Sequence, residues 1–217
     1  MLSPCLTTAA ALALVLCSPR AVADDDVVDW HTRVRNLFSD ADVSAGAVAI
    51  LRGGVHTETV VVGRRDHTED GPALDADSVH LAAALSKPVF AHLALQFAHE
   101  GLLDLDTPLA RVLPNPRLVD TEAAATITPR MLLAQSSGLP NWSGQAMELL
   151  DEPGAAWHDS GEGYLWLQGA LEQISGRSLD ELARTRVFAP LGMEHSGFIW
   201  NEGMRDRLVT GRSSFGQ

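Results

Sequence analysis

The sequence predicts an α+β fold in which a small sheet near the amino terminus is followed by a series of helices. Two neighbouring segments rich in β-branched residues, 45–51 and 57–63, read as strands. After them come several stretches with helical periodicity and capping signals. No internal repeat or low-complexity linker divides the chain of 217 residues, a length that suits one domain.

The first 23 residues have the composition of a secretory leader. An apolar run over residues 6–16 is followed by Ala21-Val22-Ala23, the small-x-small ending that signal peptidase reads. The run is too short for a membrane-spanning helix, which needs about 20 apolar residues. We therefore expect cleavage before Asp24, a domain over residues 24–217 and a secreted or periplasmic location. Cys5 and Cys17 both lie in the leader, so no disulfide or thiolate site is expected after cleavage.

The composition also bears on partners and cofactors. A formal net charge of −12 argues against binding to nucleic acid or to anionic membrane surfaces. The sequence contains no phosphate-binding loop, no dinucleotide fingerprint and no His-Glu-x-x-His motif. Two histidines with nearby glutamates, His56 and His67, have strand-like spacing, but exposed pairs of this kind seldom bind metal. No cofactor and no metal is expected.

The elements follow in order. An amphipathic helix is predicted over residues 25–38, and the two strands that follow it are joined by Arg52-Gly53-Gly54 into a hairpin. Residues 86–99 are apolar on nearly every side, which predicts a central buried helix with Pro88 in its first turn. Further helices are predicted over 128–133 and 163–174, and after the capping box Ser178-Leu179-Asp180-Glu181. Residues 198–200 are expected to form an edge strand. The predicted sheet is incomplete, because sheets usually carry about four to six strands.

Lys87 is the one lysine of the chain, whose other basic side chains are fifteen arginines. Lysine, unlike arginine, can act as a base when it is buried. In the Ser-x-x-Lys device of acyl transfer, a lysine takes the proton of a serine three residues before it. Ala84 occupies that place here, so the base is present without its nucleophile.

Six segments in this order resemble the superfamily of serine β-lactamases, penicillin-binding proteins and esterases, closest to its class C-like members. They are the hairpin strand 45–51, Ala83-Ala84-Leu85-Ser86-Lys87-Pro88, residues 101–106, residues 127–140, Ser160-Gly161-Glu162-Gly163-Tyr164 and residues 187–193. The resemblance implies a β-lactamase-like (DD-peptidase-like) helix-and-sheet sandwich. It also implies acyl transfer from, or hydrolysis of, an amide or ester.

Carried over residue by residue, the resemblance assigns a catalytic site in which two parts are substituted. Ala84 takes the place of the nucleophilic serine, Lys87 that of the base, and Asp159 that of the catalytic tyrosine, with Gly161 two positions later. The third motif of the family, Lys or His followed by x-Gly, would lie beyond Gln217. We therefore expect a catalytically inactive member, truncated before that motif.

Three functions remain open on the sequence. The chain could be an inactive member that binds a small molecule or cell-wall peptide, a fragment of a broken gene, or a hydrolase that uses substitutes such as Ser86, or Asp159 with His158. Trp142 and Trp157 follow motifs whose counterparts rim the family's cleft, and packing explains them equally well. An unpaired edge of the hairpin would also allow self-association.

Overall fold

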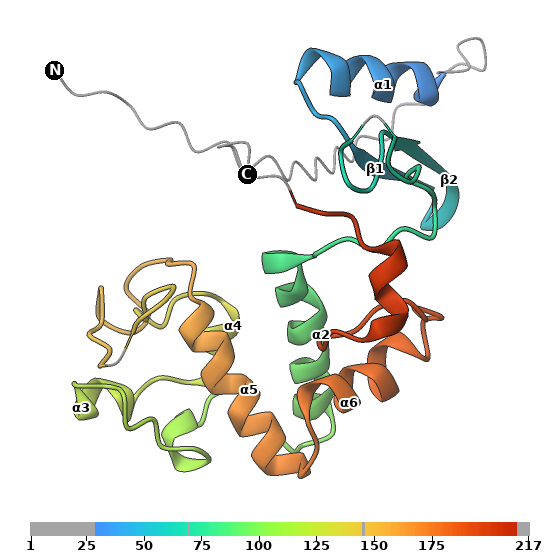
Figure 1. Cartoon of the computed structure of the whole chain (residues 1–217). Helices are drawn as coiled ribbons and strands as arrows, with labels where there is room; N and C mark the ends of the chain where they lie inside the picture. Colours follow the sequence, from blue (N-terminus) through green and yellow to red (C-terminus); the bar gives the residue numbers. More distant parts are fainter. Residues whose placement is uncertain (1–28, 69, 145, 212–217) are drawn as a thin grey trace, which may run out of the picture. The chain divides into compact units, whose positions relative to one another are not determined.

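The computed structural model describes residues 29–68, 70–144 and 146–211, and the predicted leader lies outside them (Figure 1). The chain falls into two units, which are described separately. The first holds the residues up to Leu81 together with those from Arg205 onward, and the second holds Ala82–Met204. All the predicted site residues belong to the second unit.

The first unit contains the predicted hairpin. Strands β1 (Gly46–Arg52) and β2 (Val55–Val62) pair antiparallel, with Gly46 opposite Val62 and an irregularity after Ile50. Among the described residues the sheet has these two strands and no third, as the incomplete sheet predicted from the sequence requires.

Helix α1 (Trp30–Asp40) contacts β2, and Val34 is its buried side chain. Its N-cap is Asp29, whose carboxylate accepts the backbone N–H of Thr32 at 3.2 Å. The N-cap therefore places the described start of this helix after the predicted one.

The second unit is built around α2 (Ser86–His99), which contacts both α5 and α6. Four buried side chains, Phe90, Leu93, Ala94 and Phe97, form the spacing of one helical face. Leu95 points away from it and is 50% exposed, so the helix is buried on one side rather than all round.

The other helices of this unit begin after side-chain N-caps; Ser178 was predicted as one, whereas Ser160 was not, and α5 begins two residues before its predicted start. Helix α4 (Pro129–Leu133) contacts α5 (Gly161–Ser175), and α6 (Leu179–Ala183) follows the Ser178 cap, whose hydroxyl accepts the Glu181 N–H. Figure 1 shows α4 beside the start of α5. Shorter elements complete the unit: 3-10 turns at Ala83–Leu85 and Leu109–Arg111, α3 (Thr121–Ala124) and a π-helical turn at Arg184–Phe188. A further 3-10 turn, Glu202–Arg207, contains the residues at which the second unit ends and the first resumes.

The edge strand predicted at residues 198–200 is wrong. The backbone N–H groups of Phe198 and Ile199 both donate to Oδ1 of Asp180, at 2.8 and 3.2 Å. These donors are consequently bound by a side chain of α6, and the segment forms a bend instead of a strand.

The core of the second unit is one apolar cluster. Its fully buried members come from α2, α4, α5 and α6 and from the loops between them; they include Leu93, Phe97, Leu109, Ile127, Leu132, Leu139, Met147, Leu167, Leu171 and Leu182. This cluster fixes the amino-terminal ends of α2 and α5, where the site lies. Among residues 29–68, 70–144 and 146–211, no helix is both long and apolar enough to span a membrane.

Candidate functional site

Lys87 and Asp159 form an ion pair between the starts of two helices. Lys87 is the second residue of α2, and Asp159 directly precedes Ser160, the N-cap of α5. The ammonium group of Lys87 donates to Oδ1 of Asp159. The lysine side chain is 20% exposed and the aspartate side chain 45%. The structure thus brings together two of the three residues predicted to make up the site.

Ala84, the third predicted residue, lies in the 3-10 turn that leads into α2 and lines the same pocket as Lys87. Its neighbour Ala83 has φ of +45°, a conformation that side chains of L-residues rarely adopt. Residue 84 is therefore at the wall of the pocket, close to the lysine. A methyl group at this position supplies neither a nucleophilic oxygen nor a proton donor.

Gln135 fixes the loop that carries Asp159. Its side-chain N–H donates to Oδ1 of Asp159 at 3.3 Å, and its side-chain oxygen accepts the backbone N–H of Ser160 at 2.7 Å. Its backbone carbonyl accepts the N–H of His158 at 2.8 Å. One buried glutamine thereby holds three consecutive residues. Sequence reasoning missed it, since its backbone conformation, with φ of +59°, leaves no sign in a sequence that lacks a glycine there.

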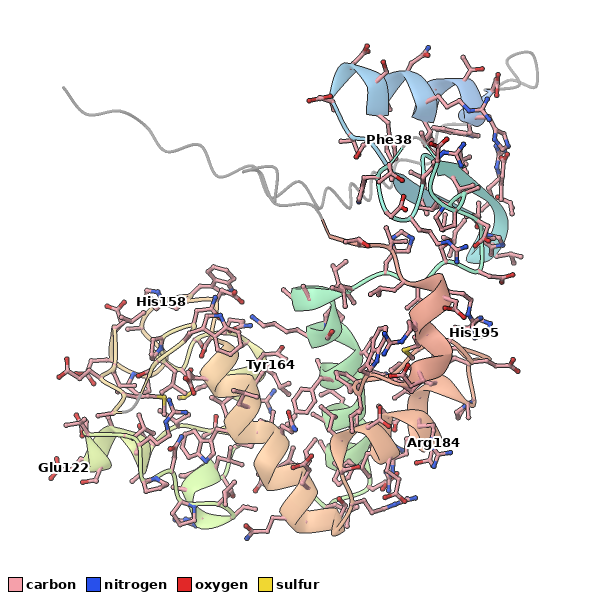
Figure 2. All side chains as sticks on the ribbon, viewed as in Figure 1. Phe38, Glu122, His158, Tyr164, Arg184 and His195 are labelled. Carbon is pink, nitrogen blue, oxygen red and sulfur yellow. The ribbon has the colours of Figure 1, made fainter. Side chains whose placement is uncertain are left out.

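Tyr164 forms the wall beside the lysine. Figure 2 shows the ring of Tyr164 on α5 turned toward α2. The centre of this ring lies 5.5 Å from the Lys87 nitrogen and 5.5 Å from the centre of the Phe90 ring. Burial, and next the charge of Asp159, raise the pKa of the Tyr164 hydroxyl. The phenol therefore stays neutral at physiological pH, and its oxygen lies toward the Leu133 carbonyl at 3.4 Å. Both observations are typical of a tyrosine that packs in the wall of the pocket.

The first turn of α5 is bound tightly to the loop before it. The Ser160 hydroxyl donates to the carbonyl of Pro140 and accepts the N–H of Gly163, both at 2.9 Å. The side-chain oxygen of Asn141 accepts the N–H of Gly161 at 2.9 Å. A Cβ at Gly161 would come within 2.9 Å of the Asn141 carbonyl and of the Trp142 ring. This close contact explains why glycine occupies position 161, two residues after Asp159.

An ion pair with a buried carboxylate supports the same turn of α5. The guanidinium of Arg117 donates to both carboxylate oxygens of Glu162, at 2.7 and 3.0 Å, and the N–H of Ser143 donates to one of them at 2.8 Å. The Glu162 side chain is 4% exposed. The hydrogen bond from Arg117, helped by that from Ser143, lowers the pKa of the Glu162 carboxyl although burial opposes the shift.

The ion pair of Lys87 and Asp159 lines a pocket of about 510 Å³. Such a volume lies within the range of small-molecule sites. The wall is mainly apolar and comes from the starts of α2 and α5, from α6 and from two loops. The side chains of Phe90, Trp142, Tyr164, Leu165, Leu179 and Phe198 provide most of it. Trp142, at 70% exposed, lines this pocket, whereas Trp157 does not.

The alternative residues considered from the sequence are placed as follows. Ser86 lines the pocket, yet its hydroxyl makes no hydrogen bond to Lys87 in the described part of the chain. His158 pairs with Asp151 at 2.5 Å. His56 contacts Thr59. No group of three or more potential metal ligands occurs among the described residues.

The chemistry that this arrangement offers is recognition by charge and shape. The pocket presents an amine and a carboxylate in contact with one another, surrounded by aromatic and aliphatic groups. The amine donates to Asp159, and the methyl group of Ala84 gives it no hydroxyl to act on.

Comparison with known proteins places the chain in a family. The family model described as Beta-lactamase matches residues 31–215. Penicillin-binding protein 4 of Amycolatopsis lactamdurans is 30% identical over 85% of this chain and 52% of its own length. Esterase EstB of Burkholderia gladioli is 30% identical over 83% of this chain and 52% of its own length. The chain thus spans about half the length of these relatives.

Solved structures agree on the fold. The class C beta lactamase from Rhodobacter sphaeroides superposes with a TM-score of 0.70 at 20% identity, covering 83% of this chain and 54% of that one. The octameric penicillin-binding protein homologue from Pyrococcus abyssi gives 0.69 at 19% identity, covering 86% and 48%. The fold is therefore the β-lactamase-like one predicted from the sequence, and the chain belongs to the Beta-lactamase family of serine hydrolase relatives.

Proposed function

We propose that this chain is a member of the Beta-lactamase family that binds a small ligand reversibly in its pocket without forming an acyl-enzyme. One observation carries the proposal: the Lys87 amine donates to Asp159, and the neighbouring wall position is the methyl group of Ala84.

The chemistry of acyl transfer explains why this observation matters. A hydroxyl group attacks the substrate carbonyl only when a base takes its proton, which requires hydrogen-bond contact between the two. Here the base contacts a carboxylate, and residue 84 has no hydroxyl. Removing the nucleophile of such a device lowers turnover by about 10⁶. What remains is a concave apolar surface with two charges, which is suited to binding.

The absence of acylation is tested by mass spectrometry of the intact protein. After incubation with a fluorescent penicillin or with a p-nitrophenyl ester, we expect the unmodified mass and no fluorescent band. A stoichiometric adduct mapped to Ser86, and abolished by Ser86→Ala, would show that the chain acylates through a substitute serine and would overturn this part of the proposal.

Binding is tested separately through Trp142. A ligand in the pocket contacts its exposed indole, so neutral aromatic probes such as 3-phenylpropanol should change the tryptophan emission in a saturable way. Because other tryptophans also emit, Trp142→Phe is the control: it should remove the change in emission while calorimetry still detects the probe. If calorimetry detects no binding of any neutral or charged aromatic probe, the reversible-binding part is wrong.

The leader predicted over residues 1–23 supports a place outside the cytoplasm, where cell-wall peptides and small esters are accessible. Expression of the full chain in a bacterial host should release a product whose first residue is Asp24. Recovery of the uncleaved chain from the cytoplasm alone would contradict this location.

A further inference from the structure

The ion pair sets two opposite charges side by side on the pocket wall, and each retains unused bonding capacity. Oδ1 of Asp159 accepts hydrogen bonds from Lys87 and Gln135, whereas Oδ2 accepts none from the residues that the structure describes. A lysine ammonium has three donors. Within the same described ranges, that of Lys87 makes one hydrogen bond. Both side chains line the pocket, so these groups are available to a ligand.

Such a pair discriminates between kinds of ligand charge. A ligand with one charge is attracted by one member of the pair and repelled by the other at a similar distance, so the two contributions largely cancel. A ligand whose positive and negative groups are neighbours can lie antiparallel to the pair. Its ammonium group then meets Asp159 and its carboxylate meets Lys87. Complementarity of this kind provides specificity.

The remainder of the pocket favours a large apolar group beside those charges. The rings of Phe90, Trp142 and Tyr164 and the side chain of Leu165 line it, and its volume is about 510 Å³. This is more space than a single aromatic or branched aliphatic side chain needs, and small-molecule sites combine such an apolar wall with a few placed polar groups.

We infer that the pocket binds the zwitterion of an α-amino acid with a large apolar side chain. In that class of molecule the ammonium and carboxylate groups are attached to one carbon, which brings them as close together as the charges of Lys87 and Asp159. The inference rests on the proposed reversible binding and adds the charge pattern of the ligand to it.

The experiment is isothermal titration calorimetry of the full chain with five ligands of similar shape. They are phenylalanine in both enantiomers, 2-phenylethylamine, 3-phenylpropionate and 3-phenylpropanol. We expect one enantiomer of phenylalanine to bind about tenfold or more tighter than either singly charged analogue. Each of those lacks one charge-assisted hydrogen bond, and a bond of this kind changes affinity by about that factor.

Variants of the two charges separate their contributions. Asp159→Asn should invert the selectivity, so that 3-phenylpropionate binds better than phenylalanine, because Lys87 then lacks a carboxylate. Lys87→Met should favour 2-phenylethylamine instead. Asp151→Asn is the matched control: Asp151 is also exposed and pairs with His158 in the same region, but it does not line the pocket. It should leave the order of affinities unchanged.

The outcomes distinguish this inference from the proposed function. If the singly charged analogues bind as tightly as phenylalanine, or only 3-phenylpropanol binds, the zwitterion inference is wrong and reversible binding stands. If no ligand binds, both fail, while mass spectrometry decides the absence of acylation independently. Thermal melts of Asp159→Asn and Lys87→Met verify that both variants fold. The comparison of phenylalanine with its singly charged analogues uses the parent chain and does not depend on the variants.

Discussion

At the scale of single residues, the hydrogen bond that Asp159 accepts from Lys87 sets the direction of the Lys87 amine. Oδ1 takes hydrogen bonds from Lys87 and from Gln135, and Gln135 is in turn bonded to the backbone on both sides of Asp159. The carboxylate is thus held in place by three hydrogen bonds of one glutamine. The amine has a fixed partner, and a hydroxyl introduced nearby would have to compete with it.

Restoring the serine therefore should not restore acylation. We expect Ala84→Ser to remain without an acyl adduct after exposure to a p-nitrophenyl ester, because parts of a catalytic device act as a unit. The double variant Ala84→Ser with Asp159→Asn should acquire adduct at position 84 faster than the single variant, since Lys87 is released from its carboxylate. Rapid labelling of the single variant would show that Asp159 does not withhold the amine. Mass spectrometry of the digested protein measures both.

Glu162 is the residue whose loss should cost most stability near the site. Glu162→Gln removes the charge that meets Arg117 in a buried two-point contact. We expect the free energy of unfolding to fall by about 2 kcal/mol, below the usual cost of breaking a fully buried pair because Arg117 is partly exposed.

Urea unfolding measures this cost, and Glu181→Gln serves as the control. Glu181 pairs on the surface with Arg177, which precedes the N-cap of α6, and both side chains are more than 40% exposed. An exposed pair of this kind contributes about 0.5 kcal/mol or less. Equal losses in the two variants would mean that the Glu162 contact is no more stabilising than a surface contact.

At the scale of elements, two glycines with similar φ angles allow the cost of backbone strain to be separated from the cost of a steric clash at Cβ. Gly138, in the loop before α5, has φ of +76°, and Gly176, at the end of α5, has φ of +69°. A Cβ at Gly138 would lie 2.1 Å from the carbonyl oxygen of Asp151, whereas one at Gly176 would meet nothing within 4 Å.

The comparison gives a definite order of stabilities. Gly176→Ala should lose about 1 kcal/mol, the cost of a left-handed conformation for an alanine. Gly138→Ala should lose clearly more, because the loop must move away from Asp151. Gly144→Ala, with open space and no positive φ, should change little. Denaturant midpoints of the three variants test the order, and equal midpoints for the variants at positions 138 and 176 would contradict it.

The elements that the sequence predicted well are those whose signals are local. The helix over residues 86–99 has the predicted bounds, and Ser178 is the N-cap of α6, as the predicted capping box requires. The segment at 198–200 was mispredicted because its backbone donors bind Asp180, a residue on another element, and no local pattern shows such a contact.

The same distinction applies to the site. Motif order predicts Lys87, Ala84 and Asp159 as site residues, and in the structure all three line one pocket. Gln135 was missed, since its role depends on a left-handed backbone conformation and on contacts more than twenty residues away. The pairing of Lys87 with Asp159 was likewise hidden, because the sequence gives the residues but not the distance between the starts of α2 and α5.

At the scale of the whole molecule, acid should unfold the protein progressively. Among the residues that the structure describes, six carboxyl groups have lowered pKa values, chiefly through hydrogen bonds that their charged forms accept: Asp29, Asp66, Asp75, Asp104, Asp106 and Glu162. A lowered pKa in the folded state means that the unfolded chain binds protons first as the pH falls. The stability that these groups supply is present above the usual values of 3.8 and 4.5 and is lost below them.

Glu162 should account for most of this dependence, because the five aspartates are exposed and exposed pairs are screened by solvent. We expect the free energy of unfolding of the parent chain to decline below about pH 4.5, the usual glutamate value. Glu162→Gln should show a shallower decline. Urea titrations between pH 3 and pH 6 measure the slopes, and parallel curves would show that other groups control acid unfolding.

The hairpin predicts association between copies. Within the described ranges β1 pairs with β2 and no other strand, and Leu51 and Val55 at its turn are mostly exposed. Unpaired strand edges promote pairing between chains, and lysine on an edge opposes it. Sedimentation velocity should show oligomers that increase with concentration and that decrease in Ala49→Lys. Ala125→Lys, an equal change of charge on another exposed surface, should leave them unchanged. A parent chain that stays monomeric would contradict the prediction.

A chain with a single lysine, and that lysine in its pocket, has an unusual relation to amine chemistry. Reagents that couple to amines will react at the amino terminus or inside the pocket and nowhere else. Immobilising the protein through its lysine on a biosensor surface would therefore block the pocket, and a tag at either end of the chain is the better attachment. Conversely, isotope-labelled methyl groups introduced by reductive methylation would give a single lysine signal in the NMR spectrum, separate from that of the amino terminus, and a molecule that enters the pocket would move the lysine signal.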